Sequence, residues 1–332
     1  MSGLVLSALL LLSPSERDSI LKVYPENAGF WREALTKYSG DTLSCVEYLF
    51  LTIPDEDRDE MTFPVLEDHV FGTLATRNNF YDDLPLQVFY EYLLKYRISD
   101  EPLSAYRYPL SAWLERRLVM QPTPYETARE IAAIIRSNIA LTDETGEKPM
   151  APTQVIPLGR ASAEERWILT CAAFRAVGIP SRPVLGWFPG VEKNLYRWID
   201  VWTGEEWQPV TVGMPPVKYV KVAFEYPSRK NITAEYRDTG TLVLMPIVNT
   251  VPGWMAELAI PSGEDTVPIT SVTLNPFRVN ELELGSGEFL LRVYFKRNGE
   301  LVGSWVKSVY VPARADTTVD LKEAQYEILP LP

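Results

Sequence analysis

The sequence predicts an α+β protein in which a helical N-terminal region precedes an all-β C-terminal sandwich. Two patterns carry this prediction. Apolar residues recur at helical spacing between capping signals over roughly residues 13 to 140. From about Pro216 onward, short strand-like runs alternate with Gly, Pro, Asn and Asp. With 332 residues and 46% hydrophobic content, the chain is long enough for two domains that each have a core.

Capping boxes mark two helix starts. Ser13-Pro14-Ser15-Glu16 and Thr123-Pro124-Tyr125-Glu126 each place a hydroxyl acceptor before a proline, with a glutamate three residues after the hydroxyl. Asp41 is expected to cap another helix, which Pro54 ends. The run LPLQVFYEYLLKYRI carries one apolar helical face, made of Leu86, Phe89, Tyr90, Leu93 and Leu94.

A helix and three strands are expected next. The helix covers about Ala163 to Val177 and ends at Gly178, with Pro180 beyond it. The strands are RPVLGWF, YRWIDVW and EWQPVTV, and Thr203-Gly204-Glu205 makes a tight turn between the last two. Alternation along the second strand puts one set of side chains on a common face, namely Tyr196, Trp198, Asp200 and Trp202.

The C-terminal part of the sequence is predicted to contain strands and no helices. They are expected in YVKVAFEY, NITAEYR, TLVLMPIV, MAELAI, SVTLN, EFLLRVYFKRNGELVGSWVKSVYV and TTVDL. Asn298-Gly299 is the strongest hairpin signal in the chain. About seven strands with such turns predict an immunoglobulin-like β-sandwich. The boundary is expected near Pro215-Pro216, which gives domains 1–215 and 216–332.

Charge and composition exclude several classes of function. The net charge of −12 disfavours nucleic-acid binding, which needs clustered Lys and Arg. Cys45 and Cys171 are far apart in sequence and His69 is the only histidine, so neither a metal site nor any other cofactor is expected. The apolar run Gly3 to Leu12 is too short to span a membrane, and it fits either a signal remnant or a buried first helix.

The segment from Arg175 to Trp207 resembles the core of the transglutaminase-like superfamily, which has a papain-like fold. The residues that carry the resemblance are Arg175, Ala176, Gly178, Ile179, Pro180 and Arg182, then Trp198, Asp200, Val201, Trp202, Gly204 and Trp207. The likeness extends over about residues 125–215, and the preceding helices are similar to those of some bacterial and archaeal members. It implies a Cys-His-Asp triad, and it favours a secreted or cell-envelope location.

At none of the three catalytic positions of the family does this sequence carry the catalytic residue. Counting along the helix, the nucleophile position falls on Ala163, or on Ala161 if Gly159-Arg160 is aligned with the family's Gly-Arg pair. The histidine position holds Tyr196, and the acid position holds Thr211. A serine beside the nucleophile position, Ser162, is more often a helix N-cap than a nucleophile. The resemblance therefore implies a degenerate triad.

Three functions remain open at this point. The first is a catalytically inactive protein that binds or assembles with a peptide, a protein or a glycan, with a candidate cleft formed by Arg160, Ser162, Trp187, Tyr196 and Trp198. Arg182 is a further candidate donor at the edge of that cleft. The second is an active cysteine- or serine-dependent acyl transferase or peptidase with relocated residues. The third is a structural surface module. Asp200 is expected to support the structure rather than to react.

Overall fold

The computed structural model describes residues 13–23, 27–143, 146–188, 195–210, 217–246, 254–262, 265–275, 277–297, 300–323 and 327–328. The chain forms two compact units. The first comprises Met1–Pro183 and Trp198–Thr211, and the second comprises Val184–Arg197 and Val212–Pro332. Strands β3 and β4 therefore each run from one unit into the other along the chain.

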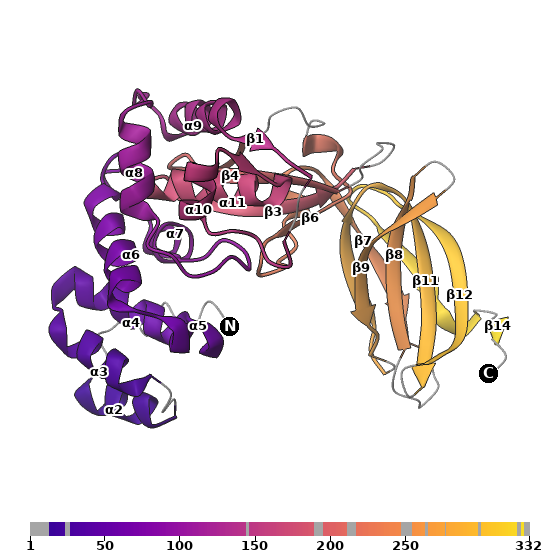
Figure 1. Ribbon diagram of the computed structural model, residues 1–332. Coiled ribbons are helices and arrows are strands. Elements are labelled where there is room, and N and C mark those ends of the chain that lie inside the picture. The colour runs from indigo at the N-terminus through magenta and orange to yellow at the C-terminus, as the bar shows by residue number, and fades with distance from the viewer. Residues whose placement is uncertain are drawn as a thin grey trace. The chain divides into compact units, whose positions relative to one another are not determined.

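Helices make up most of the first unit, as predicted (Figure 1). In chain order they are α2 (Pro14–Val23), α3 (Ala28–Lys37), α4 (Gly40–Thr52), α5 (Asp55–Glu60), α6 (Phe63–Thr76), α7 (Leu86–Val88), the π-helix η1 (Phe89–Leu93), α8 (Arg107–Glu115), α9 (Pro124–Asn138), α10 (Pro152–Leu158) and α11 (Ala163–Ala176). None of the helices in the described part of the chain is both long and apolar enough to cross a bilayer.

Both predicted N-caps are present, and at Ser13 the capping box is complete because its N–H donates to the Glu16 carboxylate at 2.8 Å. The Oγ of Ser13 accepts from the backbone N–H of Glu16 at 3.3 Å, and the Oγ1 of Thr123 accepts from that of Glu126 at 3.2 Å. The prediction for Asp41 is wrong, because α4 begins at Gly40 after Ser39. Asp41 lies within the first turn, where its carboxylate binds Arg77 instead.

The apolar face predicted after Pro85 is buried, but the helix that carries it is not regular. It changes from α7 into a π-helix, in which the N–H of Leu94 donates to the carbonyl of Phe89, five residues earlier, at 2.8 Å. Leu86 is 63% exposed because it lies in the first turn at the protein surface. The other four residues of that face join the core of the helices α2 to α7.

The strands around α11 form where they were expected. Strands β3 (Ser181–Trp187), β4 (Leu195–Trp202) and β5 (Trp207–Val210) follow the helix. In the first unit β4 pairs with β5 in antiparallel fashion, and the N–H of Thr203 donates to the carbonyl of Glu206 across the predicted turn. In the second unit β3 pairs with β6 (Val222–Glu225). A short parallel pair joins β1 (Ala140–Leu141) to β2 (Arg160–Ala161).

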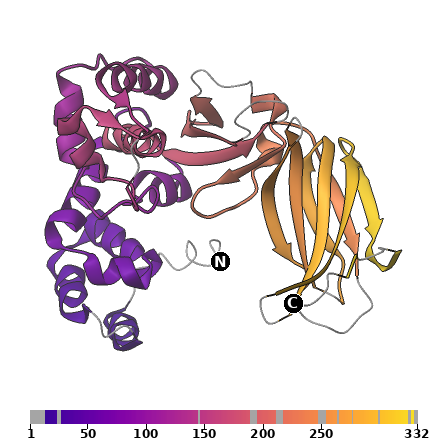
Figure 2. The same ribbon diagram turned by 45° about the vertical axis from the view of Figure 1, so that its right-hand side comes forward.

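Two sheets pack against each other in the second unit, and all their described strand pairs are antiparallel except the parallel pair of β7 with β13 (Figures 1 and 2). One has the order β10 (Asn280–Gly285), β7 (Thr239–Met245), β13 (Asp316–Asp320). The other has the order β14 (Glu327–Ile328), β12 (Glu300–Val311), β11 (Gly287–Arg297), β8 (Trp254–Ser262), β9 (Asp265–Thr273). Leucine, isoleucine and valine side chains from both sheets form one core. The chain is thus an α+β protein with a helical N-terminal region and a β-rich C-terminal part.

Two strand predictions in this part need correction. NITAEYR is not a strand, because the Oδ1 of Asn231 accepts from the N–H of Thr233 at 3.0 Å and starts the 3₁₀ helix η3 (Thr233–Glu235). Strand β10 was not predicted, although Glu281 and Glu283 are exposed and Leu284 is buried, as alternation requires. The Asn298-Gly299 hairpin prediction lies outside the described residues, as do the predictions for residues 1–12.

Candidate functional site

Side chains of β3 and β4 form a buried polar cluster in the first unit. Arg182 on β3 donates from Nε and Nη2 to Oδ2 of Asp200 on β4, at 3.1 and 2.9 Å. The other carboxylate oxygen of Asp200 accepts from the indole N–H of Trp198 at 3.0 Å. Because the Arg182 side chain is only 2% exposed, the prediction that it donates to a ligand at a cleft edge is wrong. It donates inside the fold.

Tryptophans surround this ion pair. The Arg182 guanidinium lies 4.5 Å from the centre of the Trp207 ring, a cation–π contact. The carbonyl of Trp198 accepts from the indole N–H of Trp167 on α11 at 2.8 Å, which ties the strand to the helix. Trp198 is 2% exposed and packs in the core. Asp200 supports the structure here, in the way that was expected of it.

The N-terminus of α11 is a complete capping box. The Oγ of Ser162 accepts from the N–H of Glu165 at 3.2 Å, and the Glu165 carboxylate accepts from the N–H of Ser162 at 2.8 Å. The second oxygen of that carboxylate accepts from the N–H of Met150 at 3.0 Å. Ser162 is buried, whereas Arg160 and Ala163 are exposed. Of the two candidate nucleophile positions, Ala163 therefore lies at an accessible helix end and presents a methyl group, whereas Ala161 is fully buried.

The remaining predicted site residues belong to other parts of the structure. Tyr196 and Trp187 are in the second unit, where both are half-buried. The Tyr196 ring packs edge-on against Phe188, with 5.2 Å between ring centres. Thr211 lies outside the described residues. The convergence of Ala163, Tyr196 and Thr211 in one cleft stays a prediction.

The only histidine in the chain, His69, is buried and hydrogen-bonded in the core of the first unit. His69 on α6 is fully buried, and its Nε2 faces the carbonyl of Ser104 at 3.1 Å. Its Nδ1 accepts from Nε of Arg107 at 3.3 Å, so these partners imply the neutral tautomer with the proton on Nε2. Burial, with Arg107 next, holds the pKa of His69 well below its usual range. This imidazole is structural.

Both thiols are buried and protonated. Cys171 lies in the middle of α11, where its Sγ is 3.3 Å from the Oγ of Ser181, and burial raises its pKa. Burial, with the Asp41 carboxylate next, raises the pKa of Cys45 to about 12. Cysteine reacts as its thiolate, so these environments suppress nucleophilic attack by either residue.

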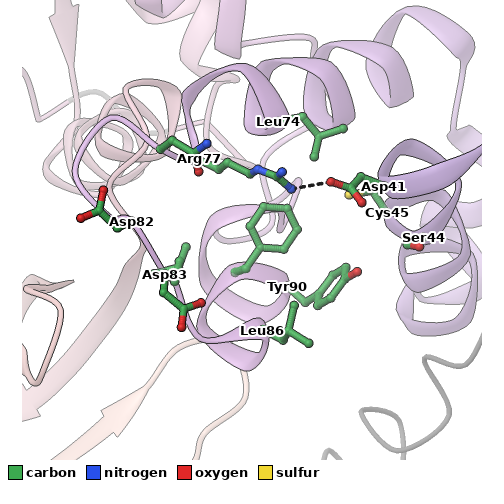
Figure 3. Close-up of a pocket in the computed structure, with 12 residues that line it drawn as sticks. Asp41, Ser44, Cys45, Leu74, Arg77, Asp82, Asp83, Leu86 and Tyr90 are labelled. Atoms are coloured by element: carbon green, nitrogen blue, oxygen red, sulfur yellow. Dashed lines mark hydrogen bonds and ion pairs between the residues drawn. The ribbon is translucent and has the colours of Figure 1, made fainter.

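Cys45 does line a pocket of about 340 Å³ in the helical region. Figure 3 shows Arg77 reaching from the end of α6 toward Asp41 on α4, and their ion pair, at 2.7 Å, lies beside the Cys45 side chain. Tyr90 and Leu86 stand on the opposite side of this opening. Within the described residues no cluster of three or more His, Cys, Asp or Glu side chains is placed to hold a metal ion.

The comparisons with known proteins point to one family. Residues 113–212 match the model of the transglutaminase-like superfamily. This segment belongs to that superfamily. It contains α9 to α11 and the strands β3 to β5, which include the buried Arg182–Asp200 pair. No curated protein matches the chain significantly.

Three solved structures match parts of the chain at low identity and low TM-score. A predicted cysteine protease from Cytophaga hutchinsonii is 15% identical over 34% of this chain and 40% of its own length, with a TM-score of 0.31. A predicted protease from Parabacteroides distasonis is 13% identical over 62% of this chain and 49% of its own, with a TM-score of 0.31. Red sea bream transglutaminase is 12% identical over 58% of this chain and 54% of its own, with a TM-score of 0.25. The chain thus spans roughly half or less of each of these proteins.

Proposed function

We propose that this chain is a catalytically inactive transglutaminase-like protein that acts by binding a peptide, a protein or a glycan. One observation carries the proposal: the only imidazole in the chain has both ring nitrogens engaged inside the helical core. A cysteine or serine nucleophile needs a base that accepts its proton. His69 cannot serve, because accepting a proton on Nδ1 would break the hydrogen bond from Arg107 and place an imidazolium beside a guanidinium.

The state of the thiols supports the same proposal. Neither Cys45 nor Cys171 has an exposed side chain, and burial raises both pKa values. The accessible end of α11, where a helix dipole would stabilise a thiolate, carries Ala163. The supporting structure of the family core is thus present without a reactive group at the helix end.

An activity assay tests the proposal directly. The full chain is incubated with dansylcadaverine and casein to detect amine incorporation, and with azocasein to detect peptide hydrolysis. We expect no turnover above the buffer control at any pH between 5 and 9. Turnover that disappears in Cys45→Ala or Cys171→Ala would refute inactivity and establish the alternative of an enzyme with relocated residues.

Thiol labelling gives an independent measurement. Iodoacetamide should label Cys45 and Cys171 far more slowly in the native protein than in denaturant, because both side chains are buried. Rapid native labelling of either thiol would contradict the proposal.

A restored thiol tests the degenerate triad. Ala163→Cys introduces a thiol at an exposed position, and the pair Ala163→Cys/Tyr196→His adds the missing imidazole. If the two positions converge, the thiol of the Ala163→Cys/Tyr196→His variant should react faster with iodoacetamide at pH 6 than the thiol of Ala163→Cys/Tyr196→Phe. The reason is that a nearby imidazolium lowers the pKa of the thiol. Equal rates for the two double variants would show that the positions do not form a triad.

A further inference from the structure

A cavity of about 510 Å³ lies entirely within the second unit. Its walls come from β3 and β6 on one side and from β8 and β9 on the other. The volume falls in the range of about 300–1,000 Å³ that is typical of small-ligand sites. Only one of the side chains in its wall, Trp187, belongs to the cleft predicted from the sequence.

Aromatic side chains form one wall of the cavity. Trp187, Phe224 and Tyr226 line it, and all three are half-buried. Trp187 and Phe224 pack edge to face, with 5.9 Å between ring centres, which fixes the tilt of the indole. The negative face of an aromatic ring attracts C–H groups that carry partial positive charge. Such a wall suits a ligand with an apolar, C–H-rich face.

Polar groups of both kinds stand around this wall. Glu225 and Glu257 supply acceptors, Arg229 supplies donors, and the hydroxyl of Thr270 can act as either. Glu225 accepts from the hydroxyl of Ser228 at 3.2 Å, which holds its carboxylate in place. A ligand that contacts both donors and acceptors is best matched by groups that can both donate and accept hydrogen bonds, as hydroxyl groups can.

The formal charges at the cavity offset one another. Two carboxylates, Glu225 and Glu257, line it with one guanidinium, Arg229. A second guanidinium, that of Arg292, lies 3.6 Å from Glu257. Because no sign of charge dominates, the site favours an uncharged ligand over a strongly cationic or anionic one.

Arg229 is held at the rim by an uncommon backbone conformation. Its φ is 55°, in the left-handed region, and its N–H closes the turn by donating to the carbonyl of Glu225 at 2.8 Å. A glycine would adopt this φ without strain, whereas a residue with a Cβ atom is strained there. Among the described residues its guanidinium contacts no carboxylate within ion-pair distance, so its donors are available to a ligand.

A peptide strand is a poorer fit for the same cavity. The outer edge of β6 is already occupied, since the N–H of Ile232 donates to the carbonyl of Ala223 and the N–H of Glu225 donates to the carbonyl of Lys230. Strand β9 is an edge strand, but Pro268 lacks an N–H and a register shift interrupts its pairing with β8. Neither edge offers the continuous row of backbone groups that β-strand addition uses.

We propose that this cavity binds a neutral oligosaccharide, one pyranose of which stacks on Trp187 while its hydroxyls bond to Arg229, Glu225 and Glu257. The inference rests on the proposed binding function and names its site and ligand class. It involves no covalent step.

The test uses the full chain and three neutral hexasaccharides, namely chitohexaose, cellohexaose and maltohexaose, in titration calorimetry. We expect at least one of them to bind with a dissociation constant below about 1 mM. Trp187→Ala should weaken that binding at least tenfold. Arg229→Gly should weaken it severalfold while keeping the fold, since glycine relieves the backbone strain. Trp305→Ala, a half-buried tryptophan of β12 away from the cavity, is the matched control and should leave affinity unchanged.

The proposal is overturned if none of the three saccharides binds below 1 mM, or if Trp187→Ala and Arg229→Gly bind as the parent does. Displacement of the bound saccharide by hexa-alanine would overturn it in favour of a peptide site. The proposed function is judged separately by the turnover assays. A chain without turnover that binds no saccharide defeats only this inference, whereas turnover defeats the proposed inactivity.

Discussion

At the residue scale, the buried ion pair between Arg182 and Asp200 is the most sensitive point of the transglutaminase-like core. The carboxylate accepts from both Arg182 and Trp198, and neither charged side chain is more than 2% exposed. Removing one partner of a buried pair leaves the other charge without compensation. A change at this position therefore acts on stability rather than on a reaction.

Asp200→Ala should lower the free energy of unfolding by about 3–5 kcal/mol. Asp200→Asn keeps an acceptor for the indole N–H of Trp198 and should lower the free energy of unfolding by less than Asp200→Ala does. Urea titrations followed by tryptophan fluorescence measure both variants, with Arg314→Ala as a control in an exposed ion pair that should change stability by less than about 1 kcal/mol. An Asp200→Ala protein as stable as the parent would contradict the structural role.

His69 gives the protein a defined response to acid. Burial keeps its pKa well below the value of about 6.5 found in unfolded chains, so the folded state holds it neutral. Below pH 6.5 the unfolded state binds a proton that the folded state does not. Stability is therefore fully present above this pH and falls as the pH drops, by up to about 1.4 kcal/mol per pH unit.

The comparison of His69→Gln with the parent at pH 7.5 and pH 5.5 isolates this effect. The variant should be less stable at pH 7.5 but should lose less stability on acidification. Asp68 and Glu101, whose pKa values burial raises, are present in both proteins. Identical pH slopes in urea titrations would show that His69 does not control the acid response.

The sequence predicted the structural roles of His69 and Cys171 correctly but misplaced Arg182. The expectations that His69 is structural and that Cys171 lies inside its helix are confirmed, because a lone histidine and a mid-helix cysteine usually pack. Arg182 was misplaced at a cleft edge, since its burial depends on a partner eighteen residues later on another strand. The second-unit cavity was missed except for Trp187, although the run AFEYPSR carries its aromatic wall and its arginine.

At the element scale, helix α11 depends on its first turn. The capping box joins Ser162, Glu165 and the backbone of Met150, all at the helix end where the sequence predicts the nucleophile position. The cap thus stabilises the start of α11 and fixes the backbone on either side of Ala163.

Ser162→Ala should destabilise the protein by about 1 kcal/mol, because the N–H of Glu165 loses its acceptor. Ser162→Gly should cost only a few tenths of that amount if capping is the sole role. Thermal and urea unfolding of both variants measure the difference. A negligible effect of Ser162→Ala would show that the buried hydroxyl contributes nothing to the helix.

Several element boundaries lie where a local signal in the sequence predicted them, although the one at Asp41 does not. Capping boxes gave the starts of α2 and α9, and Gly178, at a φ of 92°, ends α11 where it was expected. The π-helix η1 had no such signal, because its spacing matches an α-helix over only two turns. The 3₁₀ turn at Thr233 was mistaken for a strand since β-branched residues there suggested pairing.

At the scale of the whole molecule, the β-rich part has a core of its own. Side chains of both sheets pack together there, and Val222 of β6 joins them. We expect the domain boundary at Pro215-Pro216 to hold in solution, which makes residues 216–332 an independent domain.

The segment 216–332 expressed alone should show a β-type circular dichroism spectrum and a single cooperative unfolding transition. The longer segment 184–332, which adds the part of β3 that pairs with β6, is the matched comparison. Cooperative unfolding by the longer segment alone would place the domain boundary within β3, at Val184, and contradict the expected one.

The imidazole of His69, the only one in the chain, serves as an intrinsic NMR probe of the helical core. Proton NMR of the whole chain contains a single pair of histidine ring C–H resonances. Since that ring lies edge-on to Tyr106 at 4.8 Å between centres, its shifts register whether the aromatic packing of the helical core is intact. Damage to the helical core can thus be followed through one well-isolated spectroscopic signal without any label.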